Sequence, residues 1–170
     1  MLERREKMEK VTRDQVVTYL DTTPSAEETW SLLGVGITSY GIAYNPQVTT
    51  EKWIINKNAT SSLDSYQMQG DVSQKIYKGD PCFEYINKLR RELGVGSKVE
   101  THVLDIDTYD ESDGKYKATK ADCIITITTY MSEEAVIEYS IYYNGDPVTG
   151  TVEMQDGKPV FTEDSNQPSV

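Results

Sequence analysis

His102 is the only histidine of the chain and the first residue to consider for catalysis or metal binding. A catalytic histidine needs a nucleophile and an orienting partner, yet the sequence contains neither a G-x-S-x-G elbow nor an H-E-x-x-H pair. One histidine also cannot supply a zinc site built from two or three imidazoles. The alternating polar and apolar residues around His102 instead predict an exposed position on a strand.

Acidic residues between Asp105 and Gly114 raise the question of a calcium loop. An EF-hand loop has glycine at its sixth position and glutamate at its twelfth. Counted from Asp105, those positions hold Asp110 and Tyr116, so the pattern fails. We expect a solvated hairpin tip here, with adventitious binding of divalent cations as the alternative.

The remaining candidates for chemistry are weak. The glycines of residues 34–36 and 94–96 are not followed by the Lys-Ser/Thr pair of a phosphate loop. Cys82 and Cys123 have no metal-ligand spacing and are expected to be buried, reduced thiols. We therefore expect no catalytic residue, no metal site, no cofactor and no enzyme activity. An enzyme whose carboxylates meet only in space remains a minor alternative.

Charge and hydropathy restrict the possible partners. The chain carries 17 Lys and Arg against 28 Asp and Glu, a net charge of −11. This charge disfavours sequence-independent binding of nucleic acid and of anionic membranes. No apolar run approaches the ~20 residues of a membrane span, and the N-terminus does not resemble a signal peptide. We expect a soluble intracellular product with no membrane partner.

Composition and periodicity predict a mainly β fold. Val, Ile, Thr and Tyr make up about a third of the 170 residues, whereas Leu and Ala are few. We expect an antiparallel β-sandwich or barrel with one flanking α-helix. About nine strands are predicted, at residues 15–21, 30–44, 47–55, 66–77, 98–109, 117–130, 135–143, 149–154 and 159–162. The length predicts a single domain over residues 13–164, between a mobile charged arm (1–12) and a disordered C-terminus (165–170).

The one predicted helix spans residues 81–93. Asp80 is suited to the N-cap and Pro81 to the first helical position. Apolar residues three or four apart form a stripe expected to pack against the sheet: Phe83, Ile86, Leu89 and Leu93. Gly94 is expected to adopt the left-handed conformation that ends the helix.

Turn-forming residues predict how the strands connect. Residues 41–46 and 56–65 bracket a long hairpin with a weakly anchored tip. Residues 144–147 (NGDP) predict a strong turn, and Asp156-Gly157 predicts a terminal hairpin.

The order of several segments is similar to the tail tube (major tail) proteins of long-tailed bacteriophages and prophages. The N-terminal half of the resemblance consists of YLD (19–21), WSLLGVG (30–36), YNPQ (44–47) and WI (53–54). The helix segment GDPCFEYINKLR (79–90) follows and leads through GVG (94–96) into VLDID (103–107). The resemblance covers roughly residues 13–162.

This resemblance implies a structural virion protein, made in the bacterial cytoplasm and assembled into the virion tail. Six copies would form a ring, and stacked rings would form an acidic tube that meets other tail proteins and passes DNA without holding it. A long loop over residues 44–65 would reach the next ring. The residues assigned to this stacking loop are Tyr44, Asn45, Pro46, Asn56, Lys57, Asn58, Ser61 and Ser62.

Two other functions stay open at this point. One is another ring-forming virion part, a tail terminator or connector, which caps a tail and does not stack on itself. The other is a monomeric β-sandwich that binds a small ligand in an apolar pocket. Self-assembly into filaments separates these possibilities.

Overall fold

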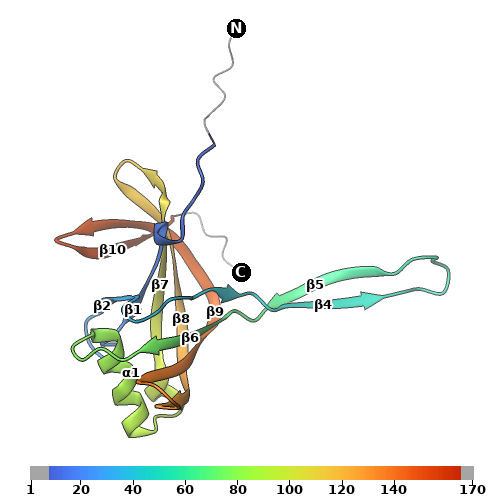
Figure 1. Ribbon diagram of the computed structural model, residues 1–170. Helices are drawn as coiled ribbons and strands as arrows, with labels where there is room; N and C mark the ends of the chain where they lie inside the picture. Colours follow the sequence, from blue (N-terminus) through green and yellow to red (C-terminus); the bar gives the residue numbers. More distant parts are fainter. Residues whose placement is uncertain (1–7, 166–170) are drawn as a thin grey trace.

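The computed structural model describes residues 8–165 (Figure 1). Residues 1–7 of the expected arm and 166–170 of the expected C-terminal tail lie outside the described residues. In chain order the elements are η1 (Arg13–Gln15), β1 (Val16–Asp21), β2 (Trp30–Leu33), β3 (Ile42–Ala43), β4 (Pro46–Glu51), β5 (Thr60–Tyr66), β6 (Gln69–Lys75), α1 (Pro81–Glu92), η2 (Gly96–Val99), β7 (Glu100–Ser112), β8 (Lys115–Tyr130), β9 (Val136–Gln155) and β10 (Lys158–Glu163).

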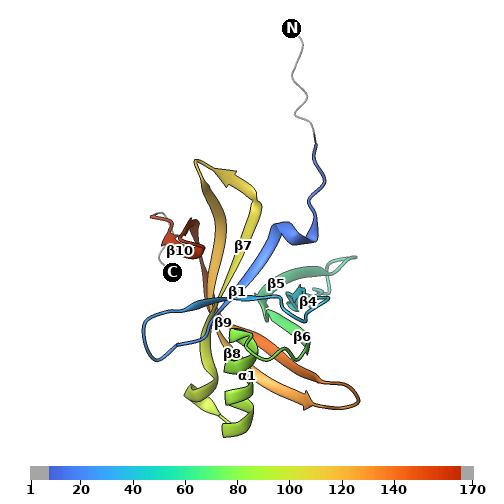
Figure 2. The same cartoon turned by 60° about the vertical axis from the view of Figure 1, so that its left-hand side comes forward.

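The fold is mainly antiparallel β with one α-helix, as the composition predicts. Eight strands form one sheet. Seven of them follow the order β2-β1-β7-β8-β9-β6-β3, and the eighth, β10, pairs with a different part of β9 than β6 does. Residues 136–142 of β9 pair with β6, whereas residues 150–155 pair with β10. The strands β4 and β5 form a separate two-stranded ribbon. Figure 2 shows β7, β8 and β9 passing behind α1 as the long central strands.

Two cores lie on opposite faces of the sheet, because successive side chains of a strand point to opposite sides. Val103 belongs to the larger core, which α1 covers, and its neighbour Leu104 belongs to the smaller one. In β9 the alternate residues Ile137, Tyr139 and Ile141 are buried in the larger core. Cys82 and Cys123 are free, buried thiols, as predicted.

The helix α1 begins as its sequence predicts but ends differently. The Asp80 side chain caps it by accepting the Phe83 backbone N–H, and Phe83, Ile86 and Leu89 are buried. Leu93 was expected in the packing stripe, yet it is 83% exposed and adopts the left-handed conformation (φ 47°, ψ 45°) assigned to Gly94. The helix therefore ends one residue early, and Leu93 contributes nothing to the core.

One buried amide fixes α1 against the sheet. Gln74, on β6, donates from Nε2 to the Val35 carbonyl (2.9 Å) and to Asp80 Oδ2 (2.8 Å). Its Oε1 accepts the Tyr139 hydroxyl at 2.8 Å. Because a buried amide is costly to leave unpaired, these bonds set the position of the helix N-terminus relative to β6 and β9.

Gly36 allows the chain to approach β6 closely. It has φ +76°, and a Cβ there would lie 2.2 Å from the Lys75 carbonyl oxygen. Its own carbonyl accepts the Lys75 N–H at 2.9 Å. The predicted strand over residues 30–44 is thereby interrupted, and only β2 and β3 remain of it.

The turn predicted at residues 144–147 is wrong. These residues lie within β9, which continues from Val136 to Gln155. The ladder with β8 shows a bulge here: Asp122 pairs with Asn144 and Lys120 with Val148, so the extra residues bend the strand without reversing it. The Asp156-Gly157 turn into β10, by contrast, is confirmed.

The buried helix stripe generates a stability prediction. Ile86→Asp places a carboxylate where the side chain is fully buried, and we expect a loss of about 4 kcal/mol or more. For a chain of this size the melting temperature should fall by about 10 °C or more. Leu93→Asp is the matched control on the same helix and should change it little, because Leu93 is exposed. Thermal unfolding followed by circular dichroism checks both; equal melting temperatures for the two variants would contradict this placement.

Candidate functional site

The most unusual surface of the molecule is the ribbon of β4 and β5, which projects far from the body (Figure 1). The two strands pair from Pro46 with Tyr66 to Glu51 with Thr60. Every residue of both strands is exposed. The ribbon therefore has a hydrogen-bonded ladder, but neither of its faces is covered by the part of the chain that the structure describes.

Local contacts hold the base of the ribbon. The rings of Tyr44 and Tyr66 meet edge to face with centroids 5.9 Å apart. Asn45 has φ 45°, and its Nδ2 donates to the Gln67 carbonyl at 3.0 Å. Along the strands, the Thr50 and Ser61 hydroxyls lie 3.0 Å apart. These contacts determine the direction in which the ribbon leaves the body.

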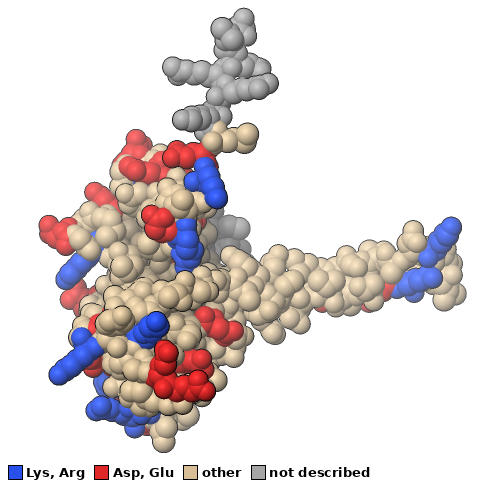
Figure 3. Space-filling view, viewed as in Figure 1, with Lys and Arg blue, Asp and Glu red and all other residues tan. Residues whose placement is uncertain are grey.

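The far end of the ribbon combines apolar and basic side chains. Residues 52–59 form the connection between the strands, with the Asn56 N–H bonded to the Trp53 carbonyl at 3.0 Å. Trp53, Ile54 and Ile55 are 66%, 103% and 80% exposed. Lysine side chains gather at this end in Figure 3, and the connection contains Lys52 and Lys57 but no acidic residue. Contiguous exposed apolar residues of this kind mark an interaction surface.

The residues expected to form a stacking loop lie in three places on the ribbon. Tyr44, Asn45 and Pro46 form its base, Asn56, Lys57 and Asn58 lie in the end connection, and Ser61 and Ser62 belong to β5. Residues 53–55 were not expected at the end of the ribbon, because the alternating pattern placed them within a strand over residues 47–55. A short apolar run followed by a polar turn is also what a buried strand shows, so the local sequence carries no signal for their exposure.

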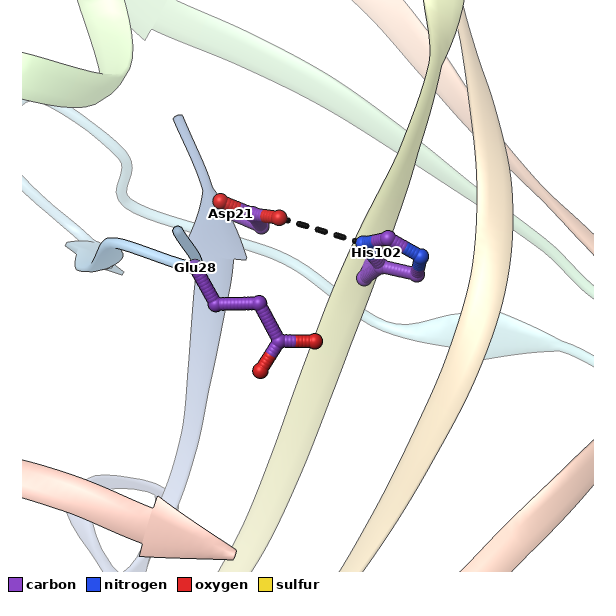
Figure 4. Close-up of side chains that lie close together, drawn as sticks. All are labelled: Asp21, Glu28 and His102. Atoms are coloured by element: carbon purple, nitrogen blue, oxygen red, sulfur yellow. Dashed lines mark hydrogen bonds and ion pairs between the residues drawn. The ribbon is translucent and has the colours of Figure 1, made fainter. Parts of the chain in front are cut away.

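His102 is half-buried and hydrogen-bonded, which differs from the expected exposed position. Its Nδ1 lies 3.1 Å from Oδ2 of Asp21, a fully buried carboxylate on β1 (Figure 4). The other oxygen of Asp21 accepts the backbone N–H groups of Thr23 (3.0 Å) and Thr29 (3.1 Å). This arrangement fixes the loop after β1 against β7.

Asp21, Glu28 and His102 also place three potential metal ligand atoms within 4.8 Å of one another. Glu28 is already paired with Lys120, and His102 Nε2 lies 3.5 Å from Oδ1 of Asp122. These carboxylates and the imidazole thus have partners within the protein, and the cluster is explained as a structural link between β1, β7 and β8.

A groove of about 1150 Å³ lies beside this cluster. One wall is α1, the other is the loop after β1, and β7 and β8 supply the base. Apolar side chains of Pro24, Ala26, Tyr85 and Leu89 line it. Its charged lining has more carboxylates than ammonium groups: Glu84, Glu92, Glu100 and Asp122 against Lys88 and Lys98.

Asp105 is the centre of a second polar network, partly buried on the β7 face that belongs to the larger core. It accepts the Thr18 hydroxyl at 2.6 Å and the Tyr143 hydroxyl at 2.9 Å, and Tyr143 in turn lies 3.1 Å from the Tyr40 hydroxyl. Burial raises the pKa of Asp105, and Asp107 adds to the increase, while the two hydroxyl donors and Arg13 act against it. The network joins β1, β7 and β9 with the loop before β3.

Within residues 8–165, no helix has the length and apolar character that a membrane crossing requires. Neither a protein-family model nor a curated protein matches the chain. Among solved structures, the chain is similar to a chain of the tail of an empty GTA particle, obtained by helical refinement with C6 symmetry. The TM-score is 0.56 at 12% identity, and the match covers 81% of this chain and 97% of that chain. This likeness confirms a tail-tube-like fold.

The environment of Asp105 predicts a pH dependence. Its folded pKa lies above the unfolded value, so the folded state holds more protons between the two pKa values, and the free energy of unfolding falls as pH rises through that window. Asp105→Asn should remove this decline relative to the parent protein. Urea unfolding at a series of pH values from 3 upward measures it.

Asp71 is the control with the opposite sign. Hydrogen bonds from Ser140 and Gln69 lower the pKa of Asp71, so its contribution to stability is present above its unfolded pKa and is lost as pH falls. Asp71→Asn should therefore lose stability relative to the parent at neutral pH but not in acid. If the free energy of unfolding varied with pH in the same way for the parent and both variants, the pKa shifts assigned to Asp105 and Asp71 would be contradicted.

Proposed function

We propose that this chain is a structural subunit of a virion tail, and that hexameric rings of it stack into a tail tube. The observation that carries the proposal is a tail-tube-like fold with an exposed ribbon that no segment of residues 8–165 covers. The similar chain belongs to a particle tail with C6 symmetry, which supports six copies in a ring. The residues expected to form the stacking loop, which lie on the ribbon, would then make the contact between rings.

The open edges of the sheet support assembly by strand pairing. Within the described residues, β2 pairs only with β1 and β10 only with β9. Unpaired strand edges are sites at which another chain can add. A closed ring of subunits would remove such edges, and a heterologous contact with rotational closure generates a ring.

The negative charge suits a channel for DNA. A net charge of −11 in each copy repels phosphates, so DNA would pass along the tube without adhering to it. The subunit would stay in the bacterial cytoplasm until assembly and would meet other tail proteins at the ends of the tube. Its role is structural, in keeping with the internal pairing of His102 and Asp21.

Shortening the ribbon tests the proposal. Because Glu51 pairs with Thr60, residues 52–59 can be replaced by Asn-Gly, which closes a two-residue hairpin. The parent protein should form rings and hollow tubes in negative-stain electron microscopy as its concentration rises. The shortened variant should keep the parent's circular dichroism and thermal unfolding, since the removed residues have no buried contact, and should form no tubes.

Ala59→Ser is the matched control, because it changes an exposed residue of the same connection while keeping its length and apolar side chains. Tubes formed by the shortened variant would remove the ribbon from the proposal. Rings without stacking in the parent protein would favour a terminator or connector. A parent protein that stays monomeric at every concentration would contradict the tail-tube function.

A further inference from the structure

The end of the ribbon has exposed apolar and basic side chains, which suit it to bind in a groove of another protein chain. Three large apolar side chains at residues 53–55 are flanked by Lys52 and Lys57 on a segment without acidic residues. An isolated two-stranded ribbon is at best marginally stable in water. Burying this end in a complementary site would remove its apolar surface from water and stabilise the ribbon.

The groove beside α1 has the complementary properties. Its volume of about 1150 Å³ exceeds the roughly 300–1,000 Å³ typical of small-ligand pockets, so it has room for several side chains. Tyr85 and Leu89 from α1 face Pro24 and Ala26 of the opposite wall, which provides apolar contact. Its lining contains four carboxylates, including Glu84 and Glu92, and two lysines, Lys88 and Lys98, so it has an excess of carboxylates for the two lysines of the ribbon end.

We propose that this groove receives the apolar end of the β4–β5 ribbon of a second copy, with Lys52 and Lys57 paired to its acidic lining. The inference rests on the proposed function and specifies the surface that one ring offers to the next. Charge complementarity selects this occupant, because the end of the ribbon is basic while the chain as a whole is strongly acidic. Desolvation of the apolar residues supplies the affinity, and the ion pairs supply orientation.

The geometry requires two copies. Figures 1 and 2 show the ribbon leaving the body on a different side from α1 and pointing away from it. The ribbon therefore cannot reach the groove of its own chain. A contact between two different surfaces is heterologous, so it continues from copy to copy and does not stop at a dimer.

Cross-linking of mixed single-cysteine variants tests the contact. Ile54→Cys at the end of the ribbon is mixed with Ala26→Cys on the groove wall, assembled, and treated with a short bismaleimide. The native thiols should stay unreactive because both are buried, and burial raises the pKa of Cys82 to about 12 and that of Cys123 higher still. Ser112→Cys, exposed at the far end of β7, is the control partner.

We expect a cross-linked dimer from the Ile54→Cys and Ala26→Cys mixture and little from the control mixture. As a second measurement, Lys57→Glu should raise the concentration needed for tube formation by roughly tenfold, which corresponds to about 1.4 kcal/mol. Combining it with Glu84→Lys and Glu92→Lys should restore assembly.

Tubes that form without the groove cross-link, or with equal cross-linking to Ser112→Cys, would overturn this inference and leave the tail-tube function standing. No tubes and no cross-link in any mixture would overturn both. Loss of assembly in Lys57→Glu without recovery in the combined variant would contradict the ion pairs with the groove.

Discussion

The ladder between β8 and β9 is the interaction on which the rest of the structure depends. Its strands run for 16 and 20 residues, so they present two broad faces with apolar side chains and two long edges of backbone groups to which further strands can pair. The faces are covered by α1 with the larger core and by the smaller core around Leu104. The edges are covered by β7 on one side and by β6 and β10 on the other. Most other elements are thus explained as covers of this pair.

The β4–β5 ribbon differs from the main sheet, whose faces and edges are largely covered by other elements. It has the same kind of ladder, yet both of its faces are exposed and its end carries uncovered apolar side chains. A body this well covered could dispense with such a ribbon for its own stability. The exposed apolar end of the ribbon is the feature from which the proposed contact with another copy of the chain was inferred, because contiguous exposed apolar residues mark interaction surfaces.

Buried polar groups connect the fold to the proposed contact. Gln74 and Asp80 set the position of α1, and the bonds of Asp21 to His102, Thr23 and Thr29 set the position of the loop that faces it. The distance between this helix and this loop defines the groove. Polar networks that are fully satisfied give one arrangement of the elements, so a groove formed between them has a defined shape before any partner arrives.

The sequence by itself determined what depends on neighbouring residues: the capped start of α1, the alternation along residues 137–143 and the Asp156-Gly157 turn. It could not determine features that depend on distant segments. The turn expected at 144–147 became a bulge because the ladder with β8 continues past it. Leu93 lies outside the core because the helix ends at Glu92 and Leu93 adopts the left-handed conformation. Asp21 and His102 are 81 residues apart, and only the pairing of β1 with β7 brings them together. The ribbon is a further example. The local pattern predicted a hairpin, but the exposure of its apolar residues depends on whether other segments of the chain pack against them.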